Sequence, residues 1–398
     1  MRTAIVSEMR LPVESQPLVI FGPPSLEYDF GPHHPLTPRR FGPGIELLRA
    51  VGAERFEPPP RASDEELRRV HTADYISTVR MLSEYPDASA MAGFSRWGDD
   101  PPFYGMHEAA SAVGGGSIAA MDAILARRTL HAFHPGGGLH HAMPTRASGF
   151  CIYNDVALAI ARARDAGHRV LYVDLDVHHG DGVEAIFRND TGVLTVSFHE
   201  TGLALFPGTG FVEDCREPGT EGTAVNVPLQ PGTSDRSWLE AVELVVPPLA
   251  QAFRPTVLIS QHGCDSHAFD PLAHLRVTTA AMSGAARMLD RLSHEHTGGR
   301  WLATGGGGYD VYRVVPRVWS LVWLAQAHAE VPAETPEDWR RRWTPDAARH
   351  DQSPVPVEML DPVGLVEPEA GVISERNLET AMAALDCSLQ SLRELARG

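Results

Sequence analysis

Short apolar runs alternate with longer amphipathic stretches along most of this chain. Runs of strand length occupy residues 129–133, 170–173, 193–198, 257–260 and 300–304. Apolar positions recur at helical spacing over residues 67–82, 109–126, 155–166, 238–252 and 280–292. Short strands that alternate with helices predict an α/β fold, in which helices cover both faces of a mostly parallel sheet.

The composition changes after about residue 330. Pro, Glu, Asp and Arg become frequent up to Pro368. After Ser374, leucines at positions 378, 385, 389 and 392 follow helical spacing. We therefore expect a main domain over residues 1–330 and an extension over residues 331–398, which ends in a helix and packs on the main domain.

The most informative polar cluster directly follows one of the apolar runs. The segment VDLDVHHGDG, residues 173–182, carries three aspartates and two histidines. Asp176 and His178 are two positions apart, so on extended backbone their side chains point to the same face. Open α/β sheets bind ligands at the carboxyl ends of their strands, and this spacing suits two ligands of one divalent metal ion. The alternative is an acidic turn that only ends the strand.

Three other clusters also follow apolar segments. They are HPGGGLHH at residues 134–141, SQHGCD at 260–265 and GGGGY at 305–309. Glycines allow the backbone to approach a ligand closely, and adjacent histidines are costly to bury without partners. Because each cluster follows a predicted strand, the four together predict one site at one edge of the sheet.

The overall composition limits the class of protein. The 398 residues, 43% of them hydrophobic, are enough for one large domain or two smaller ones. No apolar run reaches bilayer-spanning length, and residues 1–8 lack the apolar region of a signal peptide. We therefore expect a cytoplasmic protein that makes no membrane contact.

Charge and cysteine content add two expectations. The net charge of −17 comes from 51 acidic residues against 34 basic ones, all of them arginine. An acidic surface disfavours nucleic acid as a partner and favours cationic substrates, although it also serves solubility alone. The four cysteines, Cys151, Cys215, Cys264 and Cys387, form no CxxC pair, so we expect reduced thiols.

Taken together, the motifs resemble the signature blocks of a known family. The blocks are HPGGGLHHA, GFCIYND, VDLDVHHGDGVE, FPGTG, GCDSHAFDPL and GGGGY, spread over roughly residues 17–330. In this order they are similar to the zinc-dependent histone deacetylase family of the arginase/deacetylase superfamily. The segments YDFGPHHP, residues 28–35, and GDDPP, residues 98–102, resemble the bacterial acetoin-utilization deacetylases. The resemblance implies a three-layer arginase-like fold, with residues 1–330 as the deacetylase catalytic domain.

The resemblance also implies an activity and a metal site. The activity is hydrolysis of the acetyl amide of acetyl-lysine in proteins, with an acetylated protein as the partner. Asp176, His178 and Asp265 would bind the catalytic metal and leave a coordination position open. Zn²⁺ is the family's metal, but two carboxylates and one imidazole also suit Fe²⁺.

Catalytic roles follow from the same resemblance. His141 would act as general base and then as general acid, and His140 would give electrostatic support. Asp174 and Asp181 would lie behind His140 and His141 respectively, where a carboxylate fixes the tautomer of an imidazole. Tyr309 would donate its hydroxyl proton to the oxyanion of the tetrahedral intermediate.

Substrate and cation sites are implied as well. Phe150 and Phe206, with Leu272 nearby, would line the channel for the acyl-lysine stem, and Asp100, or else Asp99, would hold the substrate backbone. A structural K⁺ or Na⁺ would bind mainly backbone oxygens of Asp174, Asp176, His178, Ser197 and Phe198. A second such cation would involve Phe187, Asp190 and Val193.

Other functions remain open at this stage. An acetylpolyamine amidohydrolase uses the same machinery behind a narrower entrance, and no insertion that would narrow it is evident. A ureohydrolase with two manganese ions needs an Asp-x-Asp pair, whereas residues 263–267 offer only Asp265. A binding module without activity would be expected to lose the metal ligands or the histidines, and all are present.

Overall fold

The computed structural model describes residues 13–88, 90–220 and 222–395. Residues 1–8, on which the expectation about export rested, lie outside this part, so the cytoplasmic location stays a prediction. Within the described residues, no helix is both long enough and apolar enough to cross a bilayer.

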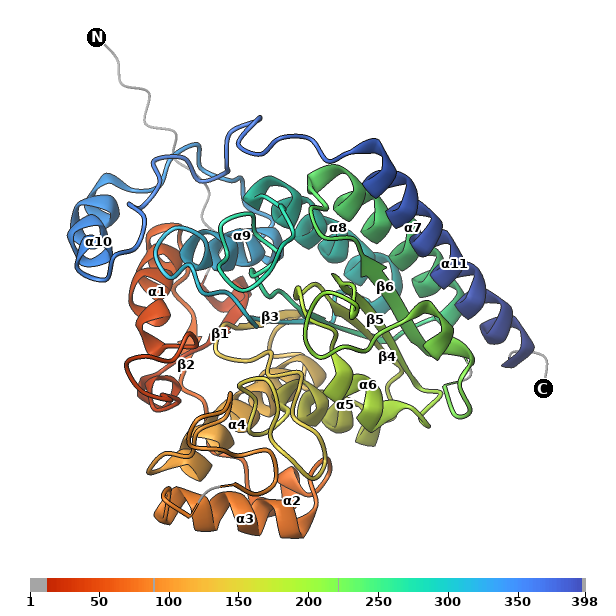
Figure 1. Ribbon diagram of the computed structural model, residues 1–398, viewed down its shortest axis with the longest axis horizontal. Coiled ribbons are helices and arrows are strands. Elements are labelled where there is room, and N and C mark those ends of the chain that lie inside the picture. Colours follow the sequence, from red (N-terminus) through yellow and green to blue (C-terminus); the bar gives the residue numbers. More distant parts are fainter. Residues whose placement is uncertain (1–12, 89, 221, 396–398) are drawn as a thin grey trace.

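One parallel sheet forms the centre of the molecule (Figure 1). Its eight strands have the order β2-β1-β3-β8-β7-β4-β5-β6, and all their pairings are parallel. The bounds are β1 Leu18–Ile20, β2 Phe56–Glu57, β3 His131–His134, β4 Val170–Asp174, β5 Val193–Glu200, β6 Ala224–Leu229, β7 Val257–Gln261 and β8 Trp301–Thr304. The predicted α/β class and parallel sheet are confirmed.

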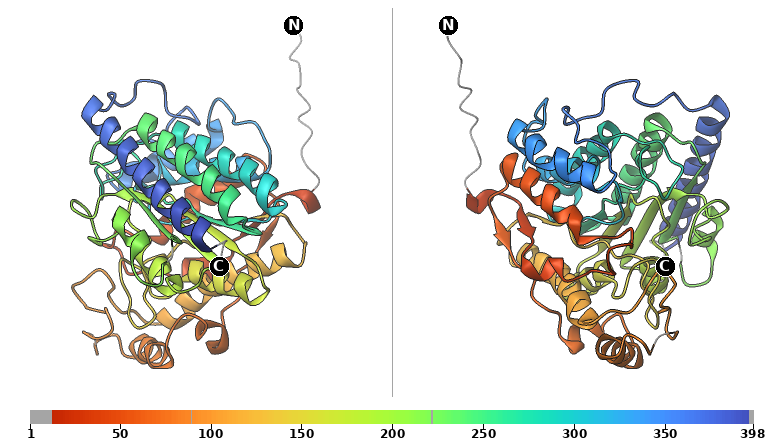
Figure 2. Two further views of the ribbon diagram at one scale, coloured as in Figure 1. Left: turned by 90° about the vertical axis from the view of Figure 1, so that its right-hand side faces the viewer. Right: turned by 60° about the vertical axis from the view of Figure 1, so that its left-hand side comes forward.

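Helices cover both faces of this sheet, which gives three layers (Figures 1 and 2). Helices α2 Asp64–Leu67, α3 Ala73–Glu84, α4 Met106–Leu125, α5 Asp155–Asp165 and α6 Asp181–Phe187 lie on one side. Helices α1 Phe41–Ala50, α7 Asp235–Phe253, α8 Thr279–Thr297, α9 Val315–Gln326 and α11 Gly371–Leu395 lie on the other, and α10 Glu337–Arg349 lies at its margin.

The strands supply side chains to both layers in turn. In β4, Leu171 and Val173 belong to one hydrophobic core, whereas Val170 and Tyr172 belong to the other. All four are at most 1% exposed. A strand that is buried on both faces must be apolar at consecutive positions, and this explains the unbroken apolar runs in the sequence.

Most predicted elements are present, but one predicted helix is wrong. Residues 67–82 do not form one helix, because α2 ends at Leu67 and α3 begins at Ala73. Thr72 caps α3 by accepting a hydrogen bond from the Tyr75 amide, and Ser63 forms a capping box with Glu66. Each cap satisfies free amides and so stabilises a separate helix start. Strands β1, β2 and β6 and helices α1, α2, α6, α9 and α10 were not predicted.

The C-terminal extension packs on the rest of the molecule. Its predicted helix is present as α11, which contacts α7, β6 and the 3-10 helix η4, Val212–Arg216. Trp339, Met359 and Ala384 are buried in the same hydrophobic core as strand residues of the sheet. The division of the chain near residue 330 remains a prediction.

Two of the cysteines correct an expectation. Cys215 in η4 and Cys387 in α11 form a disulfide, although 172 positions separate them in the sequence. The prediction of four reduced thiols is therefore wrong for this pair, because spacing along the chain gives no sign of cysteines that only the tertiary fold brings together. Cys151 and Cys264 are free and buried.

Candidate active site

Three predicted metal ligands meet at the carboxyl ends of two neighbouring strands. Asp176 and His178 follow β4, and Asp265 follows β7, which pairs with β4. The Nδ1 atom of His178 lies 3.0 Å from Oδ1 of Asp176 and 3.3 Å from Oδ2 of Asp265. Suitable ligand atoms of all three residues lie within 4.8 Å of one another. This group could hold one divalent cation.

In each of the two aspartates, the carboxylate oxygen that is not paired with His178 accepts hydrogen bonds from other residues. Oδ2 of Asp176 accepts from Gln261 Nε2 at 2.6 Å and from the Gly307 amide at 2.9 Å. Oδ1 of Asp265 accepts from the Val177 amide at 3.1 Å. Each carboxylate is thereby held in one orientation with little freedom to turn away from the cluster.

One buried oxygen in this cluster has no hydrogen bond. Oδ2 of Asp265 accepts no hydrogen bond of good geometry from any described residue, although Nδ1 of His178 lies 3.3 Å away. A buried carboxylate oxygen without a partner is costly unless a cation binds it, so the residues present fit a divalent metal. Burial and the charge of Asp176 also raise the pKa of Asp265 to about 6, as expected for carboxylates placed to share a cation.

Gly307 is required beside these carboxylates. A Cβ atom at this position would lie 1.9 Å from Oδ2 of Asp265 and 3.0 Å from Oδ2 of Asp176. Any other residue would therefore collide with the metal ligands, which explains why a glycine run passes the site.

The histidine pair lies beside the metal ligands, and each histidine has its own carboxylate. His140 Nδ1 is 2.7 Å from Asp174 Oδ2, and His141 Nδ1 is 2.6 Å from Asp181 Oδ1. The two Nε2 atoms are 3.0 Å apart. A carboxylate on Nδ1 keeps a proton on that nitrogen, so it leaves Nε2 for chemistry in the cavity.

The electrostatic surroundings distinguish the two histidines. Burial favours neutral imidazole, but the charges of Asp174 and Asp176 raise the pKa of His140 to about 9. Burial and the charge of His140 lower the pKa of His141 to about 4, against the opposing effect of Asp181. These opposite pKa shifts favour the protonated form of His140 and the neutral form of His141, whose imidazole can accept a proton.

Tyr309 lines the same cavity as the two histidines. Its side chain is 7% exposed, and its backbone amide donates to Asp270 Oδ2 at 2.8 Å. Burial and the charge of Asp265 raise the pKa of its hydroxyl well above the usual value, so the hydroxyl keeps its proton and can donate it. Phe150 packs edge-on against this ring at 5.9 Å.

A cavity of about 230 Å³ leads to this group of residues. Phe150, Phe206 and Leu272 line it, together with both histidines, Asp176, His178 and Tyr309. The Phe206 ring contacts the His141 ring edge-on, with centroids 5.0 Å apart. The walls are thus apolar, whereas the end of the cavity is polar.

The two aspartates predicted for the rim differ in exposure. Asp99 lines the cavity, whereas Asp100 is only 3% exposed, and the residue that holds the substrate backbone stays a prediction. Burial and neighbouring Asp99 raise the pKa of Asp100 to about 8. Asp99 is exposed and Asp100 is buried, a difference between neighbouring positions that the sequence of this irregular segment does not indicate.

Some residues of the site were not identified from the sequence. Arg40 is buried, and its Nη1 atom donates to the Gly306 carbonyl at 2.7 Å, which supports the loop beside Tyr309. Asp155 accepts from the amides of Gly138 and Leu139 and so fixes the loop that carries the histidine pair. Asp155 belongs to a recognised motif and could have been found, whereas no motif marks Arg40.

The two predicted monovalent-cation positions lie at opposite ends of the sheet: the first is next to the site, and the second is at the amino end of β5. Asp174 and Ser197 are paired across β4 and β5, and Phe198 follows in β5. In the second group, the Asp190 amide donates to the Phe187 carbonyl and the Val193 amide to the Asp190 carbonyl, each at 2.9 Å. Cation binding at either place stays a prediction.

Comparison with known proteins agrees with this geometry. The histone deacetylase domain matches residues 34–326. The chain is similar to a crystal structure of an HDAC homolog complexed with SAHA, with a TM-score of 0.81, 26% identity and coverage of 93% of this chain and 100% of the other. The chain therefore belongs to the histone deacetylase family. It is a metal-dependent deacetylase, which hydrolyses an acetylated substrate.

Within this family, the relatives are of the acetoin-utilization type. The chain is 40% identical over 376 residues to the acetoin utilization protein AcuC of Bacillus subtilis (strain 168), covering 92% of this chain and 96% of that protein. It is 37% identical over 336 residues to AcuC of Staphylococcus aureus (strain MRSA252), covering 83% and 86%.

Proposed function

We propose that this enzyme removes acetyl groups from acetyl-lysine in proteins, with Zn²⁺, or else Fe²⁺, at Asp176, His178 and Asp265. The observation that carries the proposal is an apolar cavity that ends at these ligands, the histidine pair and Tyr309. When bound, the divalent cation would polarise the acetyl carbonyl and acidify water.

The histidines would handle the protons of this reaction. Neutral His141 accepts a proton from the attacking water at Nε2, while the water oxygen bonds to the acetyl carbon. It then returns the proton to the amine nitrogen as the C–N bond breaks, which yields acetate and a free amine. Cationic His140 stabilises the negative charge that develops beside it, and Tyr309 donates a hydrogen bond to the oxyanion.

The cavity walls support a long aliphatic substrate. The lysine stem would lie between Phe150 and Phe206, which exclude water from around its methylenes. Asp99 lies on the cavity lining, where a carboxylate can accept hydrogen bonds from the peptide amides on either side of the acetyl-lysine. A short acetylated diamine lacks those amides, so Asp99 would strengthen the binding of protein substrates more than that of acetylpolyamines.

The test is a comparison of two aspartate variants on two substrates. We would measure kcat/KM for acetyl-lysine peptides and for acetylpolyamines with a defined metal. Asp99→Asn should lower kcat/KM for the peptides about 10-fold, the effect expected from loss of one charged hydrogen bond of ~1.5 kcal/mol. It should lower kcat/KM for the acetylpolyamines far less. Asp100→Asn is the matched control, because Asp100 is buried, outside the residues that line the cavity, and its raised pKa favours the uncharged form.

Two results would contradict the proposal. A strong preference of the wild-type enzyme for acetylpolyamines would indicate an acetylpolyamine amidohydrolase instead. Full activity after removal of all divalent metal would exclude the assigned metal centre.

A further inference from the structure

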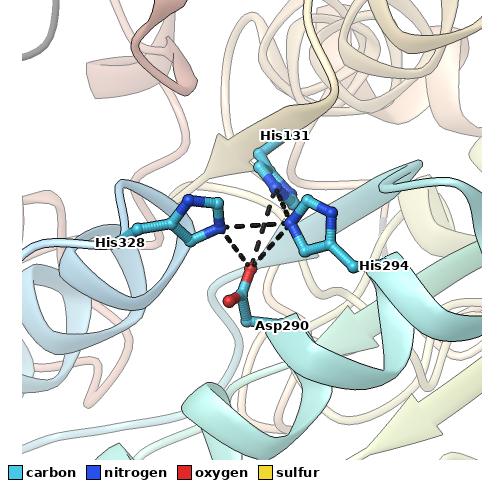
Figure 3. Close-up of side chains that lie close together, drawn as sticks. All are labelled: His131, Asp290, His294 and His328. Atoms are coloured by element: carbon cyan, nitrogen blue, oxygen red, sulfur yellow. Dashed lines mark hydrogen bonds and ion pairs between the residues drawn. The ribbon is translucent and has the colours of Figure 1, made fainter.

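A second group of metal-ligating side chains lies at the other end of the sheet (Figure 3). His131 is the first residue of β3, Asp290 and His294 belong to α8, and His328 follows the end of α9. The catalytic histidines follow the carboxyl end of β3, whereas His131 is at its amino end. This cluster is therefore separate from the active site.

The distances between these side chains match those around one tetrahedral ion. The Nε2 atom of His294 lies 3.2 Å from Nε2 of His131 and 3.1 Å from Nε2 of His328. Oδ1 of Asp290 lies 3.1 Å from the Nε2 atom of His328, 3.6 Å from that of His294 and 3.7 Å from that of His131. Four ligands at roughly 2.0–2.1 Å from a zinc ion lie about 3.3 Å from one another.

Hydrogen bonding among the four residues cannot account for this arrangement. An imidazole nitrogen carries either one proton or one lone pair, so it forms one good hydrogen bond. Nε2 of His294 nevertheless contacts two other imidazole nitrogens, and Nε2 of His328 contacts both His294 and Asp290. Some of these close contacts would be unfavourable without a cation, whereas one shared cation satisfies all of them.

The backbone holds the ligands in place. Asp290 and His294 are four positions apart on α8, so they share one face of the helix. His328 has a φ of 52°, a left-handed conformation usually taken by glycine at a helix end, and the Ala329 amide donates to the Leu324 carbonyl at 3.0 Å. From this turn the His328 imidazole points toward Asp290 and His294 of α8, as Figure 3 shows.

The cluster is also accessible to an ion. The His131 side chain is 7% exposed and forms the floor, whereas those of His294 and His328 are 40% and 53% exposed. An ion can thus enter from solvent and be partly enclosed after binding.

We propose that His131, Asp290, His294 and His328 form a second metal site that binds a divalent transition-metal ion, with Zn²⁺ as the best fit. Three imidazoles and one carboxylate are ligands typical of zinc, and imidazole also suits Cu²⁺ and Ni²⁺. Four protein ligands complete a tetrahedral shell without an open position, which makes the site structural. A bound ion would tie β3, α8 and the end of α9 together.

The test counts metal ions per chain. The purified apo-protein would be dialysed against Zn²⁺, and bound zinc would be measured by elemental analysis in four forms. We expect two ions in wild type and one in His294→Ala/His328→Ala, with deacetylase activity retained. We expect one ion in Asp176→Ala/Asp265→Ala. The matched control His296→Ala, which removes a nearby imidazole from the same helix outside the cluster, should keep two ions.

A second measurement does not depend on stoichiometry. In the Asp176→Ala/Asp265→Ala protein, Zn²⁺ at about 100 times its dissociation constant should raise Tm by about 3 °C. Adding His294→Ala/His328→Ala should abolish this rise. The proposal is overturned if His294→Ala/His328→Ala binds as much zinc as wild type, or if Zn²⁺ shifts Tm equally in both proteins.

Discussion

Two adjacent histidines have pKa values shifted in opposite directions because their neighbours differ. His140 is close to two carboxylates and has a raised pKa, whereas His141 is close to cationic His140 and has a lowered one. Both donate from Nδ1 to a carboxylate, so neighbouring charges rather than these hydrogen bonds distinguish the two pKa values. The sequence motif alone therefore does not distinguish the two histidines. The charges around each of them do.

Asp181 should act on the reaction through His141. Asp181→Asn removes a negative charge that raises the pKa of His141 and holds its tautomer. We expect kcat to fall about 10–100-fold, with bound metal unchanged. The acid limb of the pH–rate profile should move to lower pH, since loss of an anion favours the neutral imidazole. Unchanged turnover would show that this carboxylate does not position the base.

Tyr309 should affect the chemical step and little else. Tyr309→Phe removes one oxyanion donor but keeps the ring, so kcat should fall by about 10²–10³ with little change in KM. The matched control is Tyr312→Phe, because the Tyr312 hydroxyl donates to Asp346 instead of facing the cavity. Steady-state kinetics of both variants provide the check. Near-normal turnover of Tyr309→Phe would mean that the tyrosine is structural.

At the scale of elements, one carboxylate in the C-terminal extension joins the extension to two helices. Asp361 forms an ion pair with buried Arg317 of α9 at 2.8 Å, and it accepts hydrogen bonds from both the amide and the hydroxyl of Thr279 in α8. His267 Nε2 lies 2.8 Å from the same carboxylate. Although burial opposes ionisation, these partners hold the pKa of Asp361 well below its usual range.

Asp361→Asn should therefore destabilise the whole protein. The change leaves the Arg317 charge buried and unpaired, which costs about 3–5 kcal/mol in the free energy of unfolding. Because the folded pKa is depressed, this contribution is present above the unfolded pKa of about 3.9 and is lost as the pH falls below it. Urea unfolding at pH 7 and near pH 3 measures both effects. The exposed control Glu358→Gln should change stability by less than about 0.5 kcal/mol, and an equal loss in both variants would contradict the prediction.

Sequence patterns predicted the elements and ligands that local signals mark. Asp176 and His178 were predicted as ligands because they are two positions apart and follow an apolar run, and the helix break at Thr72 could have been predicted from its cap. The Asp361 contacts, the Cys215–Cys387 disulfide and the His131 cluster join segments far apart in the chain. The spacing of residues along the sequence does not indicate these contacts, because only the packing of the layers brings the segments together.

At the scale of the whole molecule, charge should influence which substrates reach the cavity. A net charge of −17 attracts cationic peptides over distances near the Debye length, about 8 Å at physiological salt. Acetyl-lysine peptides with flanking arginines should be deacetylated several-fold faster, as kcat/KM, than peptides with flanking glutamates at low salt. This ratio should approach one in 1 M salt. A ratio that does not change with salt would show that long-range charge has no part in selection.

The strand order has a consequence for synthesis on the ribosome. Strands β3 and β4, which precede the histidine pair and the first metal ligands, are separated in the sheet by β8 and β7. Those two central strands are translated last of the eight, so the earlier strands must wait roughly ten seconds at usual elongation rates with apolar edges unpaired. The nascent chain can therefore have no assembled active centre before β8 has left the ribosome, and during that interval it is a natural client for chaperones.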